Sequence, residues 1–334
     1  GTRYLLHEDV FLENPGAFHL PDLDETFEPV HRIRSWRQFN DLAHGPVLWS
    51  LEQQKRFINQ IFKLKFNGIH LGLWPQHPMV DYQIDGIHRS SWTFLFGQKI
   101  PIDHENIGRE QLWSNMPLLT HPDFRGIETF DEALTVGRRL IHGILDHSQG
   151  LGMHASIAFQ PLEFPIEFRG CLQRPTGDAI QAGGLVCAET GELNNPKHIR
   201  AIEARLRAYL EQWDRVDEFE FHLPEHPHAE AACASAWHSL AKKYNLEPEF
   251  DMADLLAQAQ ENYLVSGGVA RSEREFKSTI SMLEFMDAFF GQNDLLDQMS
   301  DKKIDMTITL GGSAEQVFPF VHRVLPPGCG LRTS

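Results

Sequence analysis

The stretch 219–228 reads FEFHLPEHPH and places one carboxylate, Glu225, among three histidines, His222, His226 and His228. A carboxylic acid whose pKa is raised by its surroundings can protonate a poor leaving group, as the cleavage of a glycosidic bond requires. Three imidazoles could instead bind a metal ion such as zinc. The metal hypothesis is the weaker one, because the prolines in this stretch break any helix that would align the histidines and the chain has no HExxH motif.

Helices and strands that alternate along the chain would position these residues. Strands are predicted near 31–40 and over 69–74, 153–159, 218–223 and 304–310, with a sixth beginning near 330. Helices are predicted over 51–66, 130–149, 196–213, 229–243 and 251–264, then from a cap at Ser272 paired with Glu275, and over 314–324. Such alternation is typical of βα units and a parallel sheet.

Two parallel architectures fit this order, a (β/α)8 TIM barrel and a doubly wound open sheet. The chain lacks the GxGxxG and GxxxxGK[ST] turns of the open-sheet nucleotide binders, and the segments after its strands are rich in Trp, His, Glu and Pro. Active sites of barrels are built from such loops. The sequence therefore predicts an α/β fold that contains about six of the eight units of a TIM barrel.

The predicted barrel would occupy residues 31–334, with a long loop insertion at 75–128. Residues 1–30 are interpreted as the end of a small N-terminal α/β domain and a connector. The remaining βα units are expected in the same polypeptide beyond Ser334, which would be a partner of this part of the chain.

Candidate binding residues follow the predicted strands. Trp74 and His77 come after the second strand, Gln160 and Glu163 after the third, and His222 lies in the fourth. Sugar rings present apolar faces that stack on aromatic rings, while their hydroxyls hydrogen-bond to His, Gln and Glu. Two alternatives stay open: His222 could face the helices, and Glu225 could be a solvated loop residue.

The neighbours of these candidates also allow purely structural roles. Glu163 could pair with Arg169 or Arg174 instead of a sugar. The aromatic residues of the insertion, Tyr82 and Trp92 among them, could pack a small core of their own.

Composition limits the partners. The formal net charge is −16, and so acidic a surface repels phosphate backbones and anionic lipids, which argues against nucleic acid and membrane partners. The four cysteines are scattered and predict neither a disulfide framework nor a redox pair. No cofactor and no resident metal is expected, and the sequence leaves a periplasmic, secreted or cytoplasmic location open.

Three segments carry a resemblance to a known group of enzymes: LEQQKRFINQIFKLKFNGIHLGLWP, GLGMHASIAFQPLEFP and VDEFEFHLPE. They are similar to barrel segments of bacterial glycoside hydrolases related to the α-glucuronidases and the family-20 hexosaminidases. GTRYLLHEDVF resembles the end of the small domain that precedes those barrels. The resemblance covers most of residues 1–225 and continues more weakly to 334.

The resemblance implies a glycosidase of carbohydrate metabolism or polysaccharide degradation, with an acid at the end of the fourth strand, which maps to Glu225. It also implies that Arg34 and Asp41, around the first strand, contact sugar hydroxyls or a uronate. The hexosaminidases carry an Asp-Glu pair where this chain has Pro224-Glu225, so their substrate-assisted mechanism does not transfer. A carbohydrate-binding barrel without catalysis and a histidine-ligated metal hydrolase remain the alternatives.

Overall fold

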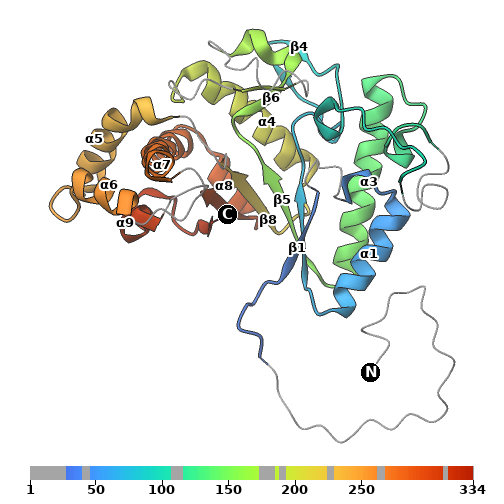
Figure 1. Ribbon diagram of the computed structural model, residues 1–334, viewed down its shortest axis with the longest axis horizontal. Coiled ribbons are helices and arrows are strands. Elements are labelled where there is room, and N and C mark those ends of the chain that lie inside the picture. The colour runs from blue at the N-terminus through green and yellow to red at the C-terminus, as the bar shows by residue number, and fades with distance from the viewer. Residues whose placement is uncertain are drawn as a thin grey trace, which may run out of the picture.

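The computed structural model describes residues 28–39, 46–106, 116–172, 185–187, 193–223, 229–261, 268–310 and 315–333, which have a mixed α/β structure (Figure 1). The main strands are β1 (Ser35–Phe39), β2 (Gly68–Gly72), β5 (His154–Phe159), β8 (Glu218–His222), β9 (Asp305–Leu310) and β10 (Gly330–Thr333). The α-helices are α1 (Leu51–Lys63), α3 (Phe130–Gly150), α4 (Pro196–Gln212), α5 (Cys233–Tyr244), α6 (Met252–Glu261), α7 (Gly268–Gly291), α8 (Leu295–Asp301) and α9 (Phe318–Val324).

Short elements lie in the connections. The strands among them are β3 (Gln83–Ile84), β4 (Ile87–His88), β6 (Glu163–Pro165) and β7 (Leu185–Cys187). The 3-10 helices are η2 (Pro46–Leu48), η3 (Leu95–Gly97), η4 (Pro122–Phe124), η5 (Ile166–Cys171), η8 (Glu230–Ala232) and η9 (Glu315–Val317). β3 pairs with β4 and β6 with β7, each antiparallel, at the loops that follow β2 and β5.

The six main strands form one parallel sheet whose order, β1-β2-β5-β8-β9-β10, is also their order along the chain. Each connection between neighbouring strands contains a helix. Because such crossovers are right-handed, a sheet whose strands are added in one direction receives all its helices on one face. In a doubly wound sheet the strand order reverses, and helices cover both faces. The observed order excludes the doubly wound alternative. In the part of the chain described, β1 and β10 remain the edges and no closed barrel forms.

Local signals fix the start of the first two long helices. Ser50 and Gln53 form a capping box at α1, in which each residue's side chain accepts the other's backbone N–H. Thr129 and Glu132 form the same box at α3. Each box satisfies backbone donors that a helix start would otherwise leave unpaired, so the predicted starts of these helices are confirmed.

The predicted start of α7 is wrong. This helix begins at Gly268, and Ser272, expected as its cap, lies inside it. The Ser272 hydroxyl donates to the carbonyl of Ala259 in α6, with 2.6 Å between the oxygens. The hydroxyl that the sequence pattern assigned to a helix cap thus joins α7 to α6 instead.

The two faces of the sheet differ in polarity, because successive side chains of a strand point to opposite faces. One face is apolar and buried: Ile69, Leu71, Ile157, Phe159, Phe219 and Phe221. Phe159 contacts Tyr209 of α4, with ring centroids 5.2 Å apart, and Phe221 contacts Phe289 of α7 at 5.6 Å. Helices therefore cover the apolar face, and the polar side chains of the same strands lie on the opposite face, called the helix-free face because the helices of the described ranges lie on the apolar side.

Candidate functional site

Buried polar side chains gather on the helix-free face of three neighbouring strands. They are His70 on β2, Ser156 on β5, and Glu220 and His222 on β8, and none of them is more than 8% exposed. Burying groups of this kind costs free energy unless they pair with one another. Their mutual contacts therefore define the chemistry that this face offers.

The four side chains form a continuous chain of contacts. Ser156 Oγ lies 2.8 Å from His70 Nδ1, and His70 Nε2 lies 3.5 Å from Glu220 Oε2. Glu220 Oε1 lies 2.9 Å from His222 Nδ1. Each oxygen of the Glu220 carboxylate thus faces one imidazole. His222, whose orientation the sequence left open, points to the helix-free face with its neighbour Glu220.

Ser156, His70 and Glu220 are the residue types of a hydrolytic triad, but their arrangement does not suit a nucleophile. Ser156 is 1% exposed, and its hydroxyl also lies 3.4 Å from the carbonyl of Ile69. His70 faces the serine through Nδ1, whereas in the known triad the histidine takes the serine proton at Nε2. The serine therefore orients His70 and is not placed to attack a substrate.

Trp74 and Gln160 lie at the carboxyl edge of this face. Gly72 pairs with Ala158, so these two residues, each two positions further on, follow neighbouring strands at the same height. Among the described residues, neither the buried indole nitrogen of Trp74 nor the buried amide oxygen and nitrogen of Gln160 has a hydrogen-bond partner. Since buried polar atoms are almost always paired, these groups are suited to bind a polar ligand.

His77 lies behind Trp74 and not beside it. It is 1% exposed, and its Nδ1 accepts the backbone N–H of Trp74 at 3.3 Å. Its ring packs on Phe94, with centroids 5.0 Å apart, and Phe94 stacks on His121 at 5.4 Å. Burial, with His77 nearby, lowers the pKa of His121 to about 3. His77 thus belongs to the core of the insertion and positions the main chain of Trp74.

Tyr82 and Trp92 also pack inside the insertion. Tyr82 stacks on Phe168 of η5, with centroids 5.1 Å apart, and burial raises its pKa to about 12. Trp92 contacts Phe94 and Phe124, at 6.0 and 5.5 Å. The structure thus favours a packing role for these two aromatic residues.

Glu163 begins β6 and lies close to Arg205 of α4. Arg205 is completely buried, and its guanidinium donates to the main-chain oxygens of Gln160 and Glu163. Burial raises the pKa of Glu163 to about 7, although the positive charge of Arg205 opposes the shift. Oε2 of Glu163 is buried and has no hydrogen-bond partner in the described part of the chain. Its carboxyl group can therefore exchange a proton near neutral pH.

The remaining predicted site residues lie elsewhere. Arg34 precedes β1 at the amino edge of the sheet, opposite the edge that carries Trp74, and donates to the carbonyls of Lys65 at 3.0 Å and His31 at 2.8 Å. Asp41 and Glu225 fall outside the described residues.

The metal hypothesis depends on His226 and His228, which also fall outside the described residues. Within the described ranges, no three His, Cys, Asp or Glu side chains are arranged to hold a metal ion. In the same ranges, no helix has both the length and the hydropathy to cross a bilayer.

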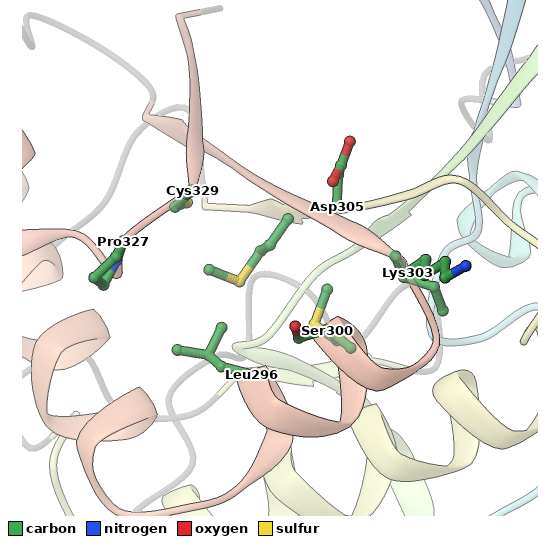
Figure 2. A pocket seen from close by; sticks show the side chains of 10 residues that line it. Leu296, Ser300, Lys303, Asp305, Pro327 and Cys329 are labelled. Atoms are coloured by element: carbon green, nitrogen blue, oxygen red, sulfur yellow. The ribbon is translucent and has the colours of Figure 1, made fainter.

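A pocket of about 270 Å³ opens at the amino edge of β9 and β10, beside α8 (Figure 2). It is lined by apolar and polar side chains together, with Cys329 just before β10; the others include Leu296, Met299, Ser300, Lys303, Ile304, Asp305 and Met306. Burial raises the pKa of the Cys329 thiol to about 12. The pocket therefore lies at the opposite end of the strands from Trp74 and Gln160 and offers no reactive thiolate.

The prediction from sequence missed the roles of Glu220, His70 and Ser156. One signal for Glu220 was available, since the alternation in EFEFH places Glu218, Glu220 and His222 on one face. The pairing of His70 with Ser156 had no local signal, because the two residues are 86 positions apart.

The sequence matches no protein-family model and no curated protein. Two solved structures of the pneumococcal exo-β-D-N-acetylglucosaminidase StrH align with it at 10% identity, with TM-scores of 0.43 and 0.39. The first concerns the tandem GH20 catalytic modules of StrH, and the second concerns N-glycan recognition and hydrolysis. The noncanonic maltogenic α-amylase AmyB of Thermotoga neapolitana aligns at 12% identity and a TM-score of 0.31.

In each alignment 90% of this chain is covered, but only 57% of each StrH chain and 67% of the amylase. This chain thus spans little more than half the length of the StrH structures. TM-scores this low carry no argument about the reaction, so the function has to be inferred from the site itself.

Proposed function

We propose that the chain is part of a (β/α)8-barrel glycoside hydrolase that acts on an oligo- or polysaccharide. The observation that carries the proposal is the pair of buried, unpartnered groups at the carboxyl edge, the indole nitrogen of Trp74 and the amide of Gln160, neither of which has a partner among the described residues. They follow two adjacent strands of a sheet whose order is that of a barrel. Barrel active sites lie at this edge.

The two groups match what a sugar offers. The apolar face of a pyranose ring can pack on the Trp74 ring, and its hydroxyls can pair with the Trp74 N–H and with both amide atoms of Gln160. Because these polar atoms are already buried, a sugar that pairs with them relieves an existing cost. His77 would contribute by holding the main chain of Trp74 in place.

In this proposal Glu225 is the general acid. In the sequence it comes three residues after the end of β8, the strand that carries Glu220 and His222. A carboxylic acid there would protonate the glycosidic oxygen while the bond breaks. A second carboxylate completes the mechanism, at about 5–5.5 Å from Glu225 for retention of configuration or about 6.5–9.5 Å for inversion.

The test compares Glu225→Gln with wild type on unactivated oligosaccharides and on 4-nitrophenyl glycosides of the same sugar. Loss of a general acid lowers kcat by roughly 10²- to 10⁴-fold on the oligosaccharides and by much less on nitrophenyl glycosides, whose leaving group needs no proton. Glu211→Gln, on an exposed part of α4, controls for the lost charge. Unchanged hydrolysis in the Glu225 variant rejects its role as acid.

The non-catalytic alternative is supported by the same two residues, since Trp74 and Gln160 would serve a binding protein equally well. Binding of an oligosaccharide without its cleavage by the wild-type protein, measured by calorimetry, would favour that alternative. Hydrolysis that stops when a chelator is added and returns with zinc would favour the metal hydrolase.

A further inference from the structure

Glu220 faces two histidines at once, and the shorter of the two contacts fixes where the proton of His222 lies. Oε1 faces His222 Nδ1 at 2.9 Å, and Oε2 faces His70 Nε2 at 3.5 Å. A carboxylate only accepts hydrogen bonds, so His222 Nδ1 must carry a proton. The contact to His70 is an ion-pair distance only and does not decide which nitrogen of His70 is protonated.

The same reasoning determines whether the other ring nitrogen of His222, Nε2, carries a proton. A neutral imidazole carries one proton, so a proton on Nδ1 leaves the lone pair on Nε2. The two nitrogens of the ring point away from each other, and Glu220 precedes His222 on β8. Nε2 is therefore directed away from Glu220.

We infer that Glu220 is a positioning residue that holds His222 as the Nδ1–H tautomer, so that its Nε2 accepts a hydrogen bond from a hydroxyl of the substrate. The identity of the donor as a sugar hydroxyl rests on the proposed function, whereas the tautomer does not. Trp74 offers only a donor and Gln160 both kinds of group, so His222 adds a pure acceptor to the site.

A carboxylate is required for this role. Glutamine has the same shape but presents one oxygen and one NH₂ group. Turned toward His222, its NH₂ group would donate to Nδ1 and favour the opposite tautomer, whereas its oxygen would keep the present one. Substitution of Glu220 by Gln therefore no longer holds His222 in a single tautomer.

The direct measurement is a long-range ¹H–¹⁵N correlation spectrum of the full 334-residue chain labelled at its 18 histidines, at a pH above the range in which imidazole is protonated. Loss of signals in His222→Gln and in His70→Gln assigns the two rings. We expect a protonated Nδ1 in His222. A His222 ring protonated at Nε2 overturns the inference and needs no other variant to be seen.

Glu220→Gln then tests the role of the carboxylate. We expect His222 to show both tautomers in this variant, and a drop in kcat/KM of tenfold or more on any glycoside that the wild type cleaves. Glu218→Gln, two residues earlier on the same face and 3.8 Å from His154, should leave the His222 ring unchanged. If Glu220→Gln leaves His222 entirely in the Nδ1–H tautomer, Glu220 has no positioning role.

The two proposals fail separately. If the protein cleaves no glycoside but His222 carries its proton on Nδ1, the proposed function is rejected and the inference about Glu220 and His222 stands. A protein that cleaves glycosides but carries the proton on His222 Nε2 rejects the inference alone.

Discussion

The guanidinium carbon of Arg205 lies 4.3 Å from the centroid of the Phe159 ring. It also lies 5.0 Å from the Phe164 ring, and its nitrogens reach the carbonyls of Gln160 and Glu163. One buried side chain of α4 thus ties the end of β5 to β6, and Gln160 lies in the short segment between these two strands. The position of this candidate binding residue therefore depends on a helix that covers the opposite, apolar face of the sheet.

Replacing Arg205 by Met should keep the apolar volume but leave two carbonyls without their donor. Hydrogen bonds to a charged group are worth about 1.5–3 kcal/mol each, so we expect the free energy of unfolding to fall by about 3 kcal/mol. Urea denaturation measures this loss. Arg200→Met, on an exposed part of the same helix, should change stability by less than about 0.5 kcal/mol, and equal effects in both variants would contradict the role of Arg205.

The helix that carries Arg205 could be predicted from sequence, but the burial of this residue could not. A single arginine in an amphipathic helix is usually exposed, and nothing in the local pattern distinguishes Arg205 from Arg200. Arg34 shows a second limit, because the strand expected near 31–40 begins only at Ser35, which leaves Arg34 at the amino edge of the sheet.

The six strands could be predicted because apolar alternation and helix caps are local signals. The contacts between strands could not, because the register of β2 against β5 and β8 decides which polar side chains meet. Ser156 and His70 come together only through that register. A candidate site can therefore be assigned to an edge of the sheet from sequence, while its hydrogen bonds depend on tertiary packing.

Glu163 should make the stability of the protein depend on pH. Its pKa is raised from 4.5 to about 7 by burial, so between these values the folded state holds a proton that the unfolded state has lost. The free energy of unfolding therefore falls as pH rises through this window and levels off above pH 7. We expect this pH-dependent fall in the free energy of unfolding to be on the order of 2 kcal/mol in the wild type and to be absent in Glu163→Gln.

Denaturant titrations of wild type and Glu163→Gln at pH 5 and pH 8 measure this difference. Glu211→Gln, on an exposed part of α4, removes a charge without the burial and should run parallel to wild type. If wild type and Glu163→Gln show the same change between the two pH values, the carboxyl group of Glu163 is not protonated in the folded protein.

Trp74 should contribute to sugar binding and little to the core. Its ring packs against Phe96, with centroids 4.9 Å apart, and its nitrogen is free of partners among the described residues. Loss of an aromatic contact and one hydrogen bond costs about 2 kcal/mol, so Trp74→Ala should weaken oligosaccharide binding roughly 30-fold in calorimetry. Trp36→Ala, at a tryptophan that is 42% exposed on β1, should leave the affinity unchanged, and a Trp74 variant with wild-type affinity would remove Trp74 from the site.

Gly137 in α3 should be essential for the insertion to dock, because no side chain fits there. A Cβ atom at this position would lie 2.2 Å from the carbonyl oxygen of Pro78 and 2.8 Å from the sulfur of Met79. The backbone oxygen cannot rotate away, so the loop that follows Trp74 would have to move. We expect Gly137→Ala to lower the free energy of unfolding by more than about 2 kcal/mol.

Gly150 supplies the matched control for this prediction. It lies at the end of the same helix, and a Cβ atom there meets nothing within 4 Å. Gly150→Ala should therefore be neutral or slightly stabilising, since alanine restricts the unfolded chain. Thermal unfolding of the two variants separates the effect of contact from that of helix propensity. If both substitutions stabilise the protein, the insertion does not pack on α3 through Pro78, and the position of Trp74 would need another anchor.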